Sequence, residues 1–168
     1  MKLLKCIYEK ITKQKAPYYF NYSFLTIIGK PIRKFVAQVL APNCPFNNIR
    51  ILLYRACGFK IGKHTFIGMK CYLDDMCYDL LNIGNNVTIS YGVYFACHGK
   101  WQEHLPIVID DGAYIGMRAS IISNNSGGVH IKTNAVIGAC TLVNRDVPEN
   151  ATAVGVPCRI IKEGYENE

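Results

Sequence analysis

The chain has 168 residues, of which half are hydrophobic, and its formal net charge is +7 at pH 7. This length suits one domain with a substantial core, and the composition excludes a chain that is disordered over most of its length. The sequence has no run of about 18 apolar residues, so it predicts no transmembrane helix. The basic start lacks the apolar stretch and the cleavage site of a secretory signal, so we expect a cytoplasmic protein.

The positive charge lies in the first third of the chain. Residues 1–60 hold eleven Lys and Arg and one acid, Glu9, whereas residues 61–168 hold eight Lys and Arg and eleven acids. The opening "MKLLKCIYEKITKQK" places apolar residues at helical spacing between lysines. Such a basic amphipathic helix either packs on the rest of the fold or makes peripheral contact with an anionic membrane. No nucleic-acid-binding motif accompanies the charge, so we expect no nucleic-acid partner.

Two further stretches of this third have the pattern of helices. They are "FLTIIGKPIRKFVAQVLAP" and "NIRILLYRACG", and we expect Pro42 and Gly58 to end them. The sequence therefore predicts a helical, basic segment over residues 1–60.

The eight cysteines show neither a CxxC pair nor the spacing of a zinc finger. Several stand where a small apolar residue would serve, which indicates buried free thiols in a reducing compartment. We therefore expect no disulfide framework and no metal.

From Ile61 onward the sequence repeats every six residues. It reads "IGKHTF", "IGMKCY", "LDDMCY", then "IGNNVT", "ISYGVY", "FACHGK", and after two breaks "IDDGAY", "IGMRAS", "IISNNS" and "IKTNAV", "IGACTL", "VNRDVP". The first position is large and apolar in all twelve sixes, and glycine recurs at the second, which suits a corner without room for a β-carbon. A helix has a period of about 3.6 and a strand a period of about 2, so a sustained period of six predicts a β-solenoid.

The spacing of the turns adds a prediction about the site. The turns start at Ile61, Ile83, Ile109 and Ile131, which are 22, 26 and 22 residues apart. Three sixes make eighteen residues, so each turn carries a surplus after its third six, at about residues 76–82, 98–108 and 124–130. We expect these insertions to project from one corner of a triangular prism and to form one wall of a cleft.

The pattern "IG-x-x-small-x" resembles the hexapeptide repeat of left-handed β-helix acyltransferases. The stretch "IKTNAVIGACTLVNRDVPENATAVGVPCRIIK" is similar to the last coil and C-terminal segment of galactoside and maltose O-acetyltransferases. Similar segments occur in streptogramin acetyltransferases and in surface-polysaccharide O-acetyltransferases. The resemblance covers about residues 61–162. It implies a β fold, a left-handed parallel β-helix over residues 61–150, with the helical segment 1–60 before it and a C-terminal segment, 151–168, packed on the helix.

The resemblance also implies a chemistry. In such enzymes acetyl-CoA lies in a groove between two subunits of a homotrimer, a histidine acts as general base, and no acyl-enzyme forms. The implied acceptor is a hydroxyl of a sugar or polysaccharide precursor. A neutral imidazole suits removal of a hydroxyl proton near neutral pH. The basic start and the poor match of residues 1–60 to the sugar enzymes favour a glycan precursor handled at the inner face of the membrane.

Of the four histidines, His98 best matches the family's base. It ends the third six of its turn, after "IGNNVTISYGVYFACH", where the longest insertion begins. His104 lies within that insertion, where it would be held less firmly; it is the alternative base and also an acceptor-binding candidate. His64 and His130 are interpreted as structural.

A carboxylate often orients a histidine base. The stretch "LDDMCYD", one turn earlier, offers Asp74, Asp75 and Asp79, of which Asp75 or Asp79 is expected nearest the corner. Solvated turn aspartates are the alternative. Tyr94 and Trp101 are candidates to stack on a sugar ring, and packing of the insertion is the other interpretation of Trp101.

A third group matches the family's donor-binding positions, which include an aromatic residue, backbone contacts to pantetheine and basic residues near the phosphates. Basic side chains suit those anions. The candidates are Tyr114, Met117, Ala139, Asn144, Arg145, Arg159 and Lys162.

Three alternatives stay open. In the first, the acceptor is an antibiotic of the streptogramin type rather than a sugar. In the second, the chain is a non-catalytic scaffold. In the third, the chain is a γ-type carbonic anhydrase whose zinc is held by His98 and His104 with His64 or His130.

Overall fold

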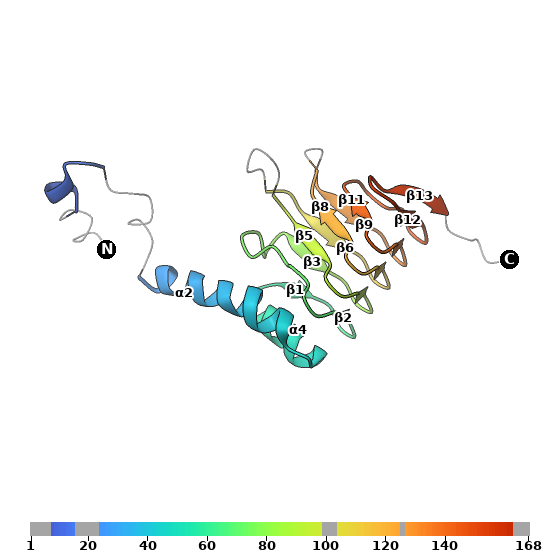
Figure 1. Cartoon of the computed structure of the whole chain (residues 1–168), viewed down its shortest axis with the longest axis horizontal. Helices are drawn as coiled ribbons and strands as arrows, with labels where there is room; N and C mark the ends of the chain where they lie inside the picture. Colours follow the sequence, from blue (N-terminus) through green and yellow to red (C-terminus); the bar gives the residue numbers. More distant parts are fainter. Residues whose placement is uncertain (1–7, 16–23, 99–103, 125–126, 163–168) are drawn as a thin grey trace. The chain divides into compact units, whose positions relative to one another are not determined.

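The computed structural model describes residues 8–15, 24–98, 104–124 and 127–162 (Figure 1). Trp101 lies outside the described residues. By its internal contacts the chain divides into two compact units, Met1–Phe35 and Val36–Glu168. Among the described residues, no helix combines the length and the apolar character needed to cross a membrane.

The N-terminal third is helical where it is described. Residues 8–12 are helical, and the first unit ends with α2, Phe24–Phe35. The second unit begins with the π-helical η2, Val36–Leu40, and the short α3, Ala41–Asn43. Pro42 does not end this helical stretch as expected. It lies in the first turn of α3, where a proline has no intrahelical hydrogen bond to lose.

The helix α4, Asn47–Ala56, packs on the first coil of the solenoid. Ile51 and Tyr54 face the core, and the buried Arg50 donates from Nε to the carbonyl of Ile67 at 2.6 Å. The helix ends at Cys57, and Gly58 then takes a φ of +98°, a left-handed conformation that glycine adopts without strain. The predicted end of this helix is confirmed.

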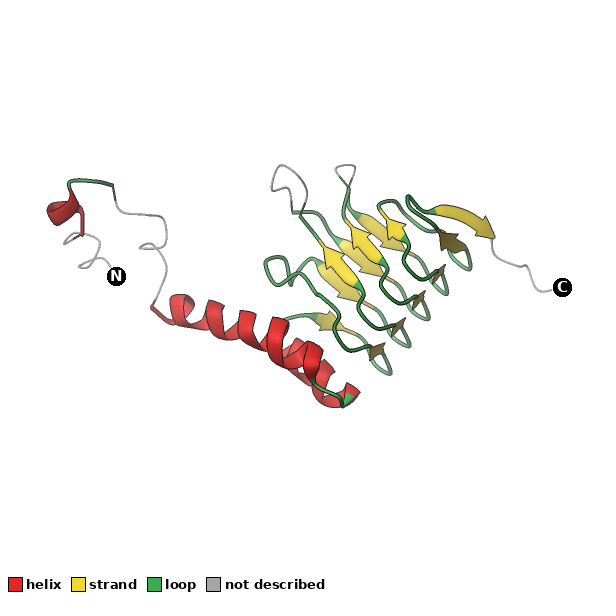
Figure 2. Cartoon of the chain, in the orientation of Figure 1, coloured by secondary structure: helices red, strands yellow, loops and turns green. Residues whose placement is uncertain are grey.

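The remainder of the second unit is a parallel β-solenoid, shown by the yellow strands of Figure 2. Sheet A contains β1 (Lys60–Ile61), β3 (Leu81–Ile83), β6 (Ile107–Ile109) and β9 (Val129–Ile131). Sheet B contains β2 (Phe66–Ile67), β4 (Thr88–Ile89), β7 (Tyr114–Ile115), β10 (Val136–Ile137), β12 (Thr152–Val154) and the antiparallel β13 (Arg159–Lys162). Sheet C contains β5 (Tyr94–Ala96), β8 (Ser120–Ile122) and β11 (Leu142–Val143).

The repeat of six explains this architecture. All twelve first-position residues point inward and are at most 9% exposed. At the second position the coils approach closely: a Cβ on Gly62 would lie 2.3 Å from the carbonyl oxygen of Gly84. Glycine is therefore required there by the neighbouring coil, as the sequence predicts.

The three insertions leave the solenoid at one corner, as predicted. The second and third lie between a strand of sheet C and the next strand of sheet A, and the first follows Tyr72, which bridges to Tyr94 of sheet C, so all three lie at the C–A corner. The in-register pairing of β5 with β8 and of β8 with β11 stacks the residues that follow these strands. His98, Asn124 and Asp146 therefore occupy one column on successive coils.

Candidate active site

His98 lies at the end of sheet C, where β5 gives way to the longest insertion. Its Nδ1 is 2.6 Å from Oδ2 of Asp74. A carboxylate accepts hydrogen bonds, so this contact assigns the proton to Nδ1, which donates to Asp74. Nε2 then carries the lone pair, and no described residue hydrogen-bonds to it. With its side chain 29% exposed, His98 has the form and the access that a general base requires.

Asp74 is fully buried and firmly held. Its Oδ2 also accepts the backbone N–H of Cys97 at 2.9 Å, and its Oδ1 accepts the backbone N–H of Met76 at 3.1 Å. A buried charge is costly unless it is hydrogen-bonded, and these donors compensate for the lost water. Asp74 can therefore orient the imidazole without moving.

The structure corrects the expected carboxylate. Asp75 points elsewhere and accepts the side-chain amide of Gln38 at 3.1 Å, while Asp79 is exposed. The bridge between Tyr72 and Tyr94 fixes the register of the first two coils. This register agrees with the spacing of the sixes and places Asp74 level with Ala96, at the end of β5, from where its carboxylate reaches the ring of His98.

His104 also lies at the site. It forms an antiparallel bridge with His98, and the N–H of Leu105 donates to the carbonyl of Cys97 at 2.8 Å. These contacts close the insertion at its base and place His104, exposed, beside His98. The sequence predicted a position deeper within the insertion.

The cysteines around Asp74 are poor nucleophiles. Burial, reinforced by the negative charge of Asp74, raises the pKa of Cys97 to about 12 and that of Cys77 to about 11. Both thiols stay protonated near neutral pH, and the thiol is far less reactive than the thiolate. The described part of the site therefore suits direct transfer with a histidine base better than a cysteine acyl-enzyme.

An aromatic pair stands on the outer face of sheet C beside this corner. The rings of Tyr94 and Tyr72 stack with centroids 4.5 Å apart and planes at 10°. Burial, with a smaller effect of Asp74, raises the pKa of Tyr72 to about 12. Tyr94 remains 40% exposed, which leaves it surface for an acceptor.

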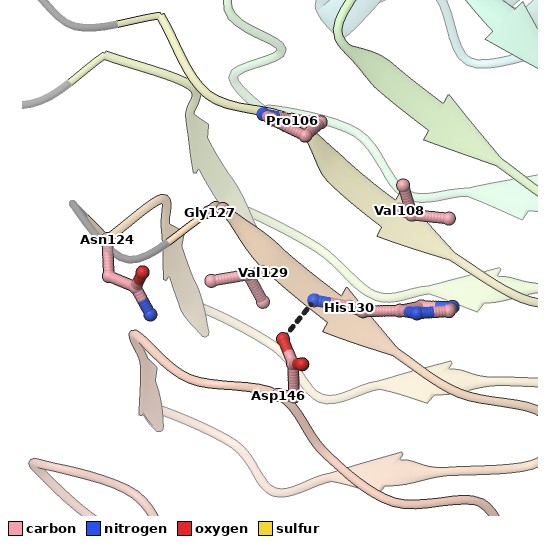
Figure 3. A pocket seen from close by; sticks show the side chains of 8 residues that line it. Pro106, Val108, Asn124, Gly127, Val129, His130 and Asp146 are labelled. Atoms are coloured by element: carbon pink, nitrogen blue, oxygen red, sulfur yellow. Dashed lines mark hydrogen bonds between the residues drawn. The ribbon is translucent and has the colours of Figure 1, made fainter.

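A second histidine–aspartate pair, not predicted from the sequence, lies on sheet A. Nε2 of His130 is 2.7 Å from Oδ2 of Asp110, and the backbone N–H of His130 donates to Oδ1 of Asp146 at 2.8 Å. His130 lines a cavity of about 410 Å³, which Figure 3 shows between Pro106, Asn124 and Asp146. The signal was available, because the spacing of 22 residues between turns places position 130 beside position 108 and diagonal to position 110.

The predicted donor-binding residues lie at two corners and on the C-terminal strand. Tyr114 faces outward from β7, and Met117 and Ala139 are stacked at the corner between sheets B and C. Asn144 and Arg145 follow β11 at the C–A corner, near the column of His98. All five are exposed, as is Arg159 on β13, the strand that Lys162 ends.

The two corners are the ends of one side of the prism. A side of about five residues at ~3.3 Å each is ~17 Å long, so one cysteamine-sized group does not reach from the B–C corner to His98 within a single chain.

Among the described residues, no three His, Cys, Asp or Glu side chains group so as to hold a metal ion. His98 and His130 are each paired with an aspartate instead.

No protein-family model matches the chain. YvoF of Bacillus subtilis, which is named as an acetyltransferase, is 32% identical over 136 residues, covering 79% of this chain and 77% of that protein. This chain belongs to the hexapeptide-repeat acetyltransferase family.

Other relatives agree with this assignment. The galactoside O-acetyltransferase of Escherichia coli is 34% identical in an alignment of 122 residues that covers 62% of the present acetyltransferase and 57% of the relative. The crystal structure of a hexapeptide-repeat acetyltransferase of Vibrio cholerae, complexed with acetyl-CoA, has a TM-score of 0.64 and 22% identity. It covers 92% of this acetyltransferase and 96% of that chain, and it shows the common fold.

Proposed function

We propose that this enzyme transfers an acetyl group from acetyl-CoA to a hydroxyl of a sugar or polysaccharide precursor, with His98 as general base. The observation that carries the proposal is the His98–Asp74 contact of 2.6 Å at the corner where the insertions gather. The complex of the Vibrio cholerae enzyme with acetyl-CoA supports the donor, and the galactoside relative supports a sugar acceptor.

The reaction follows from the protonation state of His98. Nε2 takes the proton of the acceptor hydroxyl while the oxygen attacks the thioester carbon, forming the new C–O bond. The C–S bond then breaks, and the imidazolium returns its proton to the leaving thiolate of CoA. Asp74 stabilises the imidazolium between these steps and keeps Nδ1 protonated throughout. No covalent enzyme intermediate is needed.

The donor would span two subunits. His98 and Arg145 stand at one corner, while Met117 and Ala139 stand at another, so a second copy of the chain completes the site. This separation supports the homotrimer, in which the C–A corner of one subunit faces the B–C corner of the next. Arg145 and Arg159, with Lys162, would meet the phosphates, and Asn144 would contact the same part of the donor. Tyr114 would cover the pantetheine.

On the acceptor side, Tyr94 and His104 flank His98 and would contact the sugar, together with Trp101. We infer that the reaction takes place in the cytoplasm, in polysaccharide biosynthesis, with the acceptor handled at the inner face of the membrane. The basic start of the chain supports this location.

The test is acetyl-CoA turnover by the purified full-length protein, followed by release of free thiol. The acceptors are galactosides, N-acetylated amino sugars, L-serine and a streptogramin. Turnover that depends on a sugar supports the proposal. Turnover with only L-serine or only the streptogramin would overturn the sugar acceptor and identify that compound's class as the acceptor. The absence of turnover with every hydroxyl acceptor overturns the enzymatic proposal. Light scattering at assay concentration tests the trimer, and a monomer with full activity contradicts the shared site.

A further inference from the structure

The helical end of the second unit exposes large apolar side chains. Five of them in η2, α4 and the residue before α4 are between 44% and 65% exposed. They form what we call the apolar face: Val39, Leu40, Phe46, Ile49 and Leu52. Water-soluble proteins rarely leave so much apolar surface together unless it has a partner.

The spacing along α4 shows that this surface is not the margin of the core. Phe46, Ile49 and Leu52 are three residues apart and so lie on one side of the helix. The residues that pack on the solenoid, Ile51 and Tyr54, occupy another side. The helix is thus apolar on two sides, whereas packing against a single core requires one apolar stripe. η2 packs against α4 and adds its own exposed residues to the same end of the unit.

The charge around this surface has one sign. Residues 36–73 contain five Lys and Arg and no Asp or Glu. Arg50 is buried, and the remaining four are exposed. They are Arg55, Lys60, Lys63 and Lys70. Asp75, which contacts Gln38 of η2, is buried, so the exposed charges of this segment are basic. An apolar face set among exposed cations is the composition of surfaces that lie in the interface of anionic bilayers.

Charge also argues against the protein partners that the chain itself supplies. A second copy would bring the same basic region, and residues 1–35 hold eight Lys and Arg and one acid. Either would place like charges against each other at a cost in free energy. An anionic surface is complementary to the region instead.

We propose that the apolar face, with its surrounding cations, docks the second unit on an anionic lipid bilayer. Ile49, Leu52 and Phe46 enter the boundary between headgroups and acyl chains, and the basic side chains meet lipid phosphates. This inference does not depend on the acetyl transfer, and it assigns a membrane contact to the folded second unit in addition to any made by the basic start of the chain.

The test is flotation of the full-length protein with vesicles. One set contains phosphatidylcholine alone, and the other contains phosphatidylcholine and phosphatidylglycerol in equal amounts. We expect binding to the anionic vesicles that weakens as salt is raised, because salt screens the attraction. Equal binding to both sets overturns the electrostatic part of the proposal, and binding to neither overturns all of it.

Two pairs of variants locate the contact. The double variant Ile49→Gln with Leu52→Gln should weaken binding by roughly tenfold or more, since it removes the buried apolar area. Its control is Val136→Gln with Ile161→Gln, which removes two exposed apolar residues from the solenoid and should leave binding unchanged.

Lys63→Gln should weaken binding by about fivefold, the typical effect of one cation at an anionic surface. Lys132→Gln is its control, because Lys132 lies at the same A–B corner in the fourth coil. Three coil spacings of ~4.8 Å put it ~14 Å away, beyond the Debye length of ~10 Å at 0.1 M salt.

Two results would overturn the inference while leaving the acetyltransferase intact. If the Ile49–Leu52 variant binds anionic vesicles as the unmodified protein does, residues 1–35 carry the contact. If that variant changes the oligomeric state in sedimentation, the apolar face is a protein interface. Acetyl-CoA turnover with a water-soluble acceptor should be unchanged in each variant, so failure of the proposed reaction is scored separately.

Discussion

Two histidine–aspartate pairs each join two neighbouring coils of the solenoid, and the differences between the pairs show what a general base requires. In the first, Asp74 is fully buried and binds Nδ1 of His98. In the second, Asp110 is 35% exposed and binds Nε2 of His130. The contact distances are nearly equal, 2.6 and 2.7 Å, so distance does not separate the pairs.

The two pairs differ in which ring nitrogen of the histidine is not bound to the aspartate. A histidine bound through Nδ1 presents Nε2, the atom farthest from the backbone, to a substrate. A histidine bound through Nε2 leaves Nδ1, which lies close to its own main chain and is poorly placed to meet a hydroxyl. In Figure 3 the ring of His130 also points away from Asn124, along the sheet. We therefore infer catalysis at His98 and a structural hydrogen bond between His130 and Asp110.

The largest expected effect tests this distinction directly. His98→Ala should lower kcat by about 10²–10⁴-fold, because it removes the imidazole that Asp74 holds in the tautomer a base requires. Binding of CoA, measured by calorimetry, should change little. His130→Ala makes the same replacement in the other pair and should leave kcat close to that of the unmodified enzyme. Equal losses in both variants would contradict the assignment.

The second effect concerns the carboxylates. Asp74→Asn keeps the size of the side chain but can donate to Nδ1, which favours the tautomer with Nε2 protonated and removes the base. We expect kcat to fall by about 10²-fold or more, with little change in KM for acetyl-CoA. Asp110→Asn is the matched control and should not lower kcat.

A positioning role for Asp74 predicts more than a loss of rate. The wrong tautomer persists at all pH values above the imidazole titration, so raising the pH should not restore activity in Asp74→Asn. Recovery at high pH would contradict the positioning role, because the balance between two neutral tautomers does not change with pH. Thermal unfolding of both variants reports whether the buried substitution has disturbed the fold.

Much of the fold follows from the sequence, because the repeat of six is imposed by packing at every coil. The inward first positions and the crowded glycines are visible as residue types, and the unequal turn lengths locate the C–A corner. The choice of His98 likewise rests on its position before the longest insertion.

The carboxylate could not be chosen in the same way. Asp74 and Asp75 are neighbours in the sequence, and the conformation of the chain at the corner decides which carboxylate turns toward His98. The bridge from Tyr72 to Tyr94 keeps the register of the sixes, so the spacing of the repeat does not distinguish the two side chains. The hydrogen bond of His130 with Asp110 is also a contact between coils, and it becomes visible only when the turns are aligned.

The smallest expected effect is a dependence of stability on pH, and it comes from the burial of the groups around Asp74. The pair of His130 and Asp110 is more exposed and lacks this burial. The pKa of Cys97 rises from 9.0 to about 12, and that of Cys77 from 9.0 to about 11. Below pH 9 both thiols are protonated in the folded and the unfolded chain, so they add no dependence on pH. Above pH 9 the thiols of the unfolded chain lose their protons first, so the unfolded chain binds fewer protons than the folded chain. The free energy of unfolding therefore falls as pH rises from about 9 toward 11 and 12.

Urea unfolding at a series of pH values measures this slope. Cys97→Ala removes one of the linked groups, so its free energy of unfolding should fall less steeply above about pH 9 than that of the unmodified protein. Cys140→Ala removes a thiol from an exposed corner and serves as the control, with the slope retained. If Cys97→Ala keeps the full slope, the surroundings of Asp74 admit water as freely as those of Asp110. The rigid placement of Asp74, on which the comparison of the two pairs depends, would then lose its support.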